Sequence, residues 1–144
     1  MPTVHDLMAR KGVETVSILP TDTVLEAAQR MNERGIGGLL VLEAGQLVGI
    51  FTERDILRRV VALNRDPETT LVKTVMTSPV ITCLPETSVE ECGAIMTLRR
   101  IRHLPVADAR GLIGIVTSGD VLAFRVDEQQ ATIKYLNDYM FDMR

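Results

Sequence analysis

The sequence predicts an α+β fold in which two β-α-β-β-α repeats pack as a pseudo-two-fold pair, with a C-terminal helical extension. The first observation is an internal repeat, because a shift of 65 positions aligns residues 16–57 with residues 81–122 without a gap. The second is composition, since 46% hydrophobic residues are enough for a packed interior. The third is the order of apolar runs and turns, which is the same in both copies.

The repeat divides the chain into four segments. Residues 1–63 form the first repeat with its N-terminal lead-in, and residues 64–70 form a polar linker that contains a proline. Residues 71–124 form the second repeat, and residues 125–144 form a C-terminal helix. A unit of about 60 residues buries too little surface to be stable alone. We therefore expect the two repeats to share one core.

Each repeat begins with a short apolar strand that ends at a proline, Val16–Leu19 in the first copy and Val80–Leu84 in the second. An amphipathic helix follows. In the first copy, its buried face consists of apolar residues at i, i+3, i+4 and i+7 from Val24, and its N-cap lies within residues 21–23. Gly35 is expected to end this helix as a left-handed cap.

Two apolar runs around a tight turn then predict a β-hairpin in each copy. The turns are Ala44-Gly45 and Asp108–Gly111. The second strand of each hairpin passes directly into a helix through the segments Thr52–Asp55 and Thr117–Asp120. The Thr-x-x-Asp pattern at this junction is therefore a candidate functional motif.

Thr-x-x-Asp has two interpretations. As a helix capping box it contributes about 1 kcal/mol and needs no ligand. As a binding element, an aspartate in the first turn of a helix can accept hydrogen bonds from the vicinal hydroxyls of a ribose, and the free helix amides can hold a phosphate. The pattern occurs twice at matching points, and both acids are Asp where capping boxes prefer Glu or Gln. This favours binding, although both roles can coexist.

The repeats resemble a tandem pair of cystathionine-β-synthase (CBS) domains of the stand-alone signal-transduction type. The most specific segments are Gly49–Asp55, Gly114–Asp120 and Ile101–Val106, and the resemblance covers about residues 4–124. It implies a regulatory, non-catalytic module. Such modules bind adenosine-containing ligands in the clefts between the repeats, so the expected ligand is AMP, ADP, ATP or NAD(H).

The resemblance also assigns roles to residues. Asp55 and Asp120 would contact the ribose, and Thr52 and Thr117 would lie beside the ribose or the α-phosphate. The first strands, around Ser17-Ile18 and Thr82-Cys83, would supply apolar walls and backbone groups for adenine. The complete set of predicted ligand-binding residues is Ser17, Ile18, Gly38, Thr52, Arg54, Asp55, Thr82, Arg102, His103, Thr117, Ser118 and Asp120.

The two copies differ in charge, which predicts unequal sites. Arg99 and Arg100 lie at a helix end and are expected to be solvated. Arg102 and His103 instead enter a predicted buried strand, where a charge needs an anionic partner such as a phosphate. The first copy has glycines at positions 35, 37 and 38, which leave space there. Arg54 could add further positive charge for a phosphate.

Composition argues against several other functions. The net charge of −3 and the aromatic content of 3% disfavour a nucleic-acid binder, which needs a basic face or stacking platforms. The sequence has no apolar run of about 20 residues and no secretory signal pattern, so we expect a cytoplasmic protein without membrane association.

The sequence contains no phosphate-binding glycine loop, metal-binding motif or activated nucleophile, so we expect neither an enzyme nor a resident cofactor or metal. Cys83 and Cys92 are expected to be reduced core residues.

The C-terminal segment predicts an oligomer. Ile133, Leu136, Met140 and Met143 follow a 3-4-3 spacing, which indicates either a helix packed back on its own domain or the seam of a homodimer. We favour the homodimer, with an unknown effector protein as the further partner. Two alternatives to nucleotide sensing remain: a structural dimerisation module without a physiological ligand, and a sensor of S-adenosylmethionine or metal ions.

Overall fold

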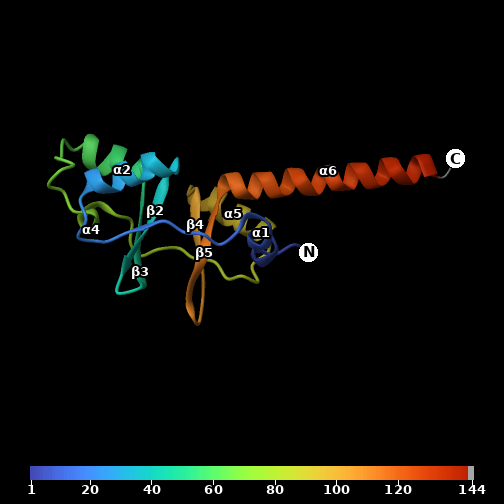
Figure 1. The fold of residues 1–144 in the computed structure, drawn as a ribbon, viewed down its shortest axis with the longest axis horizontal. Helices are drawn as coiled ribbons and strands as arrows, with labels where there is room; N and C mark the ends of the chain where they lie inside the picture. Colours follow the sequence, from blue (N-terminus) through green and yellow to red (C-terminus); the bar gives the residue numbers. More distant parts are fainter. Residues whose placement is uncertain (143–144) are drawn as a thin grey trace.

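Both predicted repeats are present in the computed structural model, which describes residues 1–142 (Figure 1). The first repeat has a three-stranded sheet of order β1-β2-β3, in which β1 is parallel and β3 antiparallel to β2. The second has the antiparallel hairpin β4-β5. In chain order the elements are α1 (Val4–Lys11), β1 (Ser17–Ile18), α2 (Val24–Arg34), β2 (Gly38–Glu43), β3 (Gln46–Thr52), α3 (Glu53–Asp55), the π-helical segment η1 (Ile56–Val61), α4 (Val72–Val75), α5 (Val89–Arg99), β4 (His103–Asp108), β5 (Gly111–Thr117) and α6 (Ser118–Asp142).

The helix ends follow from local sequence. Thr23 caps α2 by accepting a hydrogen bond from the Glu26 amide, and Ser88 caps α5 in the same way. Gly35 ends α2 in the left-handed conformation, with φ of 64°. The second copy places Arg100 at the matching position with φ of 56°, a conformation that is uncommon for residues other than glycine. The expected cap at Gly35 is therefore confirmed.

The expected strand Val80–Leu84 is wrong, because that segment forms only an isolated parallel bridge between Cys83 and Val106. In the first copy, the amide of Leu40 donates a hydrogen bond to the Val16 carbonyl and lengthens the β1-β2 ladder. The residue at the matching position of the second copy is Pro105, which has no N–H to donate. One rung of the ladder is lost, and the strand is not completed.

The prediction of one shared core is also wrong, because the buried residues form two clusters, one in each repeat. Each cluster is completed by the lead-in helix that precedes the other repeat. Leu7 and Met8 of α1 pack with the core of the second repeat, whereas Val72 and Val75 of α4 pack with the core of the first. Figure 1 shows α1 beside α5, and α4 beside the first sheet. The lead-ins therefore interlock the repeats.

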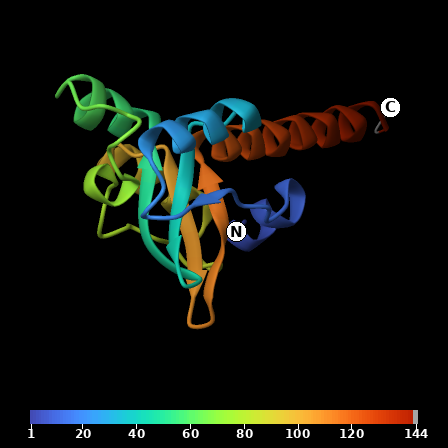
Figure 2. The ribbon, with the colours of Figure 1, turned by 60° about the vertical axis from the view of Figure 1, so that its left-hand side comes forward.

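The β2-β3 hairpin lies beside the β4-β5 hairpin about the pseudo-two-fold axis (Figure 2). Gly38 and His103 occupy matching positions of the two repeats and meet there. A Cβ atom at Gly38 would lie 3.1 Å from two ring atoms of His103 and 3.2 Å from Cγ2 of Thr52. The absence of a side chain at Gly38 thus makes room for the imidazole, and this explains the difference between the two copies at that position.

Helix α6 continues without a break past the end of the second repeat and projects from the body (Figures 1 and 2). Val121 and Phe124 are buried, but Ile133, Leu136 and Met140 are exposed by 58%, 51% and 66%. The helix therefore does not pack back on its own domain along this stretch. Met143 of the 3-4-3 pattern lies outside the described residues. Within residues 1–142, no helix is long and apolar enough to cross a lipid bilayer.

Candidate functional site

A cleft of about 340 Å³ lies between the end of β3 in the first repeat and the segment that enters β4 in the second. The first repeat contributes the Thr-x-x-Asp motif and the start of η1, and the second contributes the turn after α5. The lining residues are Gly37, Ile50, Thr52, Glu53, Arg54, Asp55, Leu57, Arg58, Thr77, Arg100, Ile101, Arg102 and His103. Thr52, Arg54, Asp55, Arg102 and His103 were predicted from sequence, and they meet in this cleft.

Among the described residues, Asp55 is the only polar or charged residue that is buried, with 6% of its surface exposed. Its Oδ2 accepts a hydrogen bond from the Thr52 amide at 3.0 Å, which is the capping-box contact. Its Oδ1 accepts from the Thr77 hydroxyl at 3.0 Å, and Nε of Arg59 lies 3.7 Å away. The Thr52 hydroxyl also donates to Oδ2, at 3.4 Å, so of the two lone pairs on each carboxylate oxygen one on Oδ1 remains available. Capping and ligand binding are therefore compatible at Asp55.

Asp120 occupies the matching position in the second repeat but has a different partner. Its Oδ2 accepts from the Thr117 amide at 2.8 Å, and its own amide donates to Thr117 Oγ1 at 3.1 Å. The ammonium of Lys11 also donates to Oδ2, at 2.5 Å. Burial alone would raise the pKa of Asp120, but the hydrogen bonds from Lys11 and Thr117 outweigh it and lower that pKa. The second carboxylate is thus ionised and paired with a cation.

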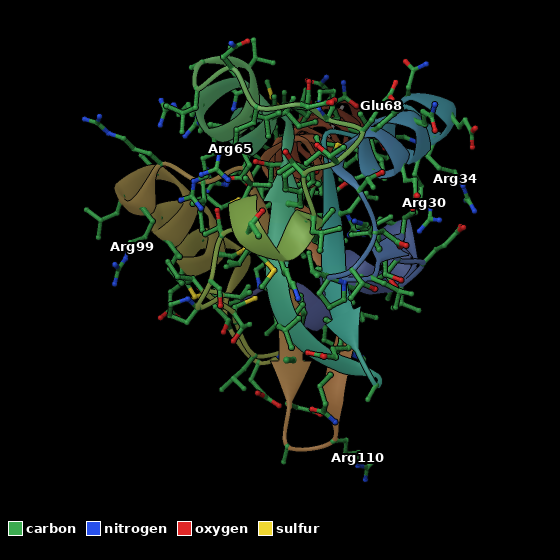
Figure 3. The ribbon with its side chains drawn as sticks, turned by 90° about the vertical axis from the view of Figure 1, so that its left-hand side faces the viewer. Arg30, Arg34, Arg65, Glu68, Arg99 and Arg110 are labelled. Carbon is green, nitrogen blue, oxygen red and sulfur yellow. The ribbon has the colours of Figure 1, made fainter. Side chains whose placement is uncertain are left out.

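Positive charge dominates the cleft. Four arginines line it, at positions 54, 58, 100 and 102, against the carboxylates of Glu53 and Asp55. Arg54 also links the repeats, because its guanidinium donates to the Arg100 carbonyl at 2.7 Å. Arg99, by contrast, points away from the body, as expected for a solvated residue (Figure 3). Such a concentration of guanidinium groups suits an anion with several oxygens.

Two expectations about the basic residues need correction. Arg102 is exposed and lies just before β4, so the prediction that it enters a buried strand is wrong. Its charge needs no buried partner, although the side chain still lines the cleft. Arg100, expected to be merely solvated, also lines the cleft, because the left-handed turn after α5 directs the chain there.

His103 is half-buried between the repeats. Burial lowers its pKa below the ordinary value of 6.5, and Arg102 and Lys11 act in the same direction, whereas Glu53 and Asp120 oppose them. The folded protein therefore binds a proton at His103 less readily than the unfolded chain does. The neutral imidazole is the form that the fold favours.

This shift predicts a loss of stability in acid. Because the unfolded chain takes up the proton first, the free energy of unfolding should decrease as pH falls below 6.5 toward the lowered pKa of His103. Urea unfolding at about pH 7.5 and about pH 5.5 measures the effect. The wild-type chain should lose more stability than the His103→Gln variant over this interval. Equal losses in the two proteins would contradict the assignment.

The residues predicted to surround adenine do not line this cleft. Ile18 is 2% exposed within the first core, so its side chain is already covered and cannot serve as a free wall. The Ser17 carbonyl accepts a hydrogen bond from Arg30. Thr82 lines a separate groove of about 710 Å³ near the hairpin turns, together with Pro79 and Val80. The apolar part of the cleft is instead formed by residues from other elements, namely Ile50, Leu57 and Ile101.

The remaining residues that were predicted to bind the ligand lie in the second repeat or beside the pseudo-two-fold axis. Thr117 and Ser118 lie where β5 passes into α6, and the Ser118 amide donates to the Arg102 carbonyl at 3.0 Å. Gly38 packs against His103. Sequence reasoning missed Thr77 and Lys11, which come from segments outside the aligned repeat and carry no motif. Arg58 was detectable, since it follows Arg54 by four residues in a helical segment.

The two repeats, each with a Thr-x-x-Asp junction, and the cleft between them agree with the comparison to known families. The model of the CBS domain matches residues 4–62 and again residues 72–127. The chain belongs to the CBS domain family. CBS domain pairs are generally regulatory modules that bind ligands. Among residues 1–142, no group of three or more His, Cys, Asp or Glu side chains is placed to hold a metal ion.

Relatives of this CBS pair include other proteins built from the same module. The chain is 37% identical to the CBS domain-containing protein CBSX3, mitochondrial, of Arabidopsis thaliana, covering 96% of this chain and 71% of that protein. It is also 37% identical to the CBS domain-containing protein YhcV of Bacillus subtilis, covering 91% of each. A solved structure of a putative signal-transduction protein with CBS domains from Burkholderia ambifaria is 39% identical, with a TM-score of 0.81, covering 85% of this chain and 92% of that one.

Proposed function

We propose that this CBS pair is a non-catalytic sensor that binds an adenine nucleotide, AMP, ADP, ATP or NAD(H), in the cleft between its repeats and signals occupancy to a partner protein. The observation that carries the proposal is the meeting of a buried carboxylate, Asp55, with four arginines from both repeats in one cleft. A volume of about 340 Å³ falls within the range of small-molecule sites, which begins at about 300 Å³.

Each part of a nucleotide has a chemical counterpart in this cleft. A ribose hydroxyl would donate to the free lone pair of Asp55 Oδ1, and the phosphates would contact Arg54, Arg58 and Arg102. Adenine would lie against the aliphatic side chains of Ile50, Leu57 and Ile101, which replace the walls expected from the first strands. Because the base would be held by aliphatic contacts, ribose and phosphate contacts would supply most of the specificity.

Isothermal titration calorimetry of the full chain with AMP and ATP tests this proposal, using Asp55→Asn and the charge-matched control Asp127→Asn on the exposed face of α6. A hydrogen bond to a charged group contributes about 1.5–3 kcal/mol, so Asp55→Asn should weaken binding by about 10- to 150-fold. The control should bind like the wild type. An absence of heat with every adenine nucleotide, or unchanged affinity in Asp55→Asn, would favour the structural-module alternative instead.

We also propose that the chain forms a homodimer through α6, which gives the sensor a route to an effector protein. Exposed apolar residues on the projecting part of this helix support the interface. A solved neighbour, described as a hexameric CBS-CP12 protein from bloom-forming cyanobacteria, is 31% identical with a TM-score of 0.74, and its assembly supports oligomerisation here. A cytoplasmic location stays a prediction, since one relative is named as mitochondrial.

A further inference from the structure

The two Thr-x-x-Asp carboxylates are held by chemically different groups from the two lead-in segments. In the first repeat, Asp55 Oδ1 accepts from the neutral hydroxyl of Thr77, just after α4. In the second, Asp120 Oδ2 accepts from the ammonium of Lys11, the last residue of α1. The same ammonium donates to the Ile115 carbonyl at 2.7 Å. Lys11 therefore ties α1 to both the strand and the helix of the second motif.

Lys11 is held in this position by the rest of α1. Leu7 and Met8 are buried in the second core. Arg10 forms an ion pair with Glu128 at 2.7 Å, and its guanidinium lies 4.5 Å from the ring centroid of Phe124 on α6. Lys11 and Asp120 have side chains exposed by only 26% and 24%, so solvent screens their attraction less than that of a surface pair. The pair is consequently a fixed feature of the fold.

A ribose at the second motif would have to compete with this ammonium. Oδ2 of Asp120 already accepts from Lys11 and from the Thr117 amide, so both of its lone pairs are engaged and a ribose could bind only at Oδ1, beside the Lys11 ammonium. Displacing Lys11 would leave a partly buried cation without its carboxylate, which is more costly than displacing a hydroxyl such as that of Thr77. The first motif has no ammonium bonded to its carboxylate, since the cation beside Asp55, Nε of Arg59, lies 3.7 Å from Oδ1 and Arg59 is a more exposed residue.

We propose that Lys11 blocks the second Thr-x-x-Asp motif to nucleotides, so that each chain binds one nucleotide, at the Asp55 cleft. This inference rests on the proposed function, and it assigns the N-terminal helix the role of an internal occupant of the second site. The asymmetry of the pair then arises from a lead-in residue outside the aligned repeats, and not from the arginines alone.

Calorimetry with AMP on full-length variants tests the inference. Lys11→Met removes the ammonium but keeps an apolar stem of similar length, and Lys73→Met on α4 is the matched control. We expect one AMP per chain for the wild type and for Lys73→Met, and two for Lys11→Met. Adding Asp120→Asn to Lys11→Met should weaken the second binding event by at least about tenfold. Lys11→Gln provides a second uncharged variant if the Met variant does not fold.

Backbone amide NMR shifts on AMP addition give a readout that needs no variant. In the wild type, the amides of residues 52–55 should shift most, whereas the amide of Asp120 should not shift. A wild-type chain that bound two AMP molecules would overturn the inference. So would one AMP per chain in both the wild type and Lys11→Met, a result that would leave the proposed function intact. Binding by Lys11→Met alone would refute the wild-type nucleotide site at Asp55, and with it the inferred stoichiometry of one nucleotide per chain. No binding by any variant would refute both.

Discussion

Replacing Leu7 by Ala is expected to destabilise the second repeat, although Leu7 precedes the first repeat in the chain. Leu7 is 1% exposed and lies in the same buried cluster as Leu104, Val106 and Val116. Truncating a fully buried Leu to Ala costs about 2–5 kcal/mol, through lost burial and the cavity that remains. This is a large fraction of the about 5–15 kcal/mol that stabilises an ordinary domain.

Native-state hydrogen exchange locates the effect. In Leu7→Ala, amide protection should decrease most in α5, β4 and β5, and less in β2 and β3. Val75→Ala is the reciprocal control, because Val75 of α4 is 1% exposed in the first core. Its largest loss should therefore fall in β2 and β3. If Leu7→Ala instead weakened its own sequence-adjacent repeat, the interlocked packing of the lead-ins would be wrong.

Most of the fold could be predicted from the sequence, because an element that the pattern indicates in one repeat is expected at the matching position of the other. The hairpins and the Gly35 cap follow from short-range patterns, and the structure contains them. The interlock was not accessible, because Val4–Met8 and Val72–Met76 resemble each other and similarity cannot say which core each enters. The missing strand was accessible in principle, since Pro105 stands where a donating amide is needed.

The Thr-x-x-Asp residues of the site were predicted from the repeated motif, whereas the partners of the two carboxylates that lie outside the repeat were missed. Asp55 and His103 lie within the aligned repeats, and they line one cleft. Lys11 and Thr77 reach the two carboxylates from the lead-ins, whose destinations only the tertiary fold reveals. Ile18 does not line this cleft, because the inward position of its short strand is occupied by core packing.

The helix α6 has the pattern of a parallel two-stranded coiled coil along its exposed side. Val126, Ile133 and Met140 fall at one core position of a heptad, and Leu122 and Leu136 at the other, with Gln129 between them. β-Branched residues at the first position with Leu at the second favour two parallel strands. The apolar members of this seam are exposed by 40% to 66% in the single chain. A second copy of α6 would cover them.

Ile133→Glu combined with Leu136→Glu is therefore expected to convert the proposed dimer to a monomer. The substitutions place charges opposite each other in an apolar seam, and loss of the buried side chains from both chains should raise the dimer dissociation constant at least about a thousandfold. Sedimentation equilibrium measures this, with Ala131→Glu combined with Tyr135→Glu as a control that adds the same charge away from the seam. Because Ile133 and Leu136 are 58% and 51% exposed in the single chain, the charged variant should keep its fold. A variant that still dimerised would move the interface to other exposed apolar residues, such as Leu57 and Val61 on η1.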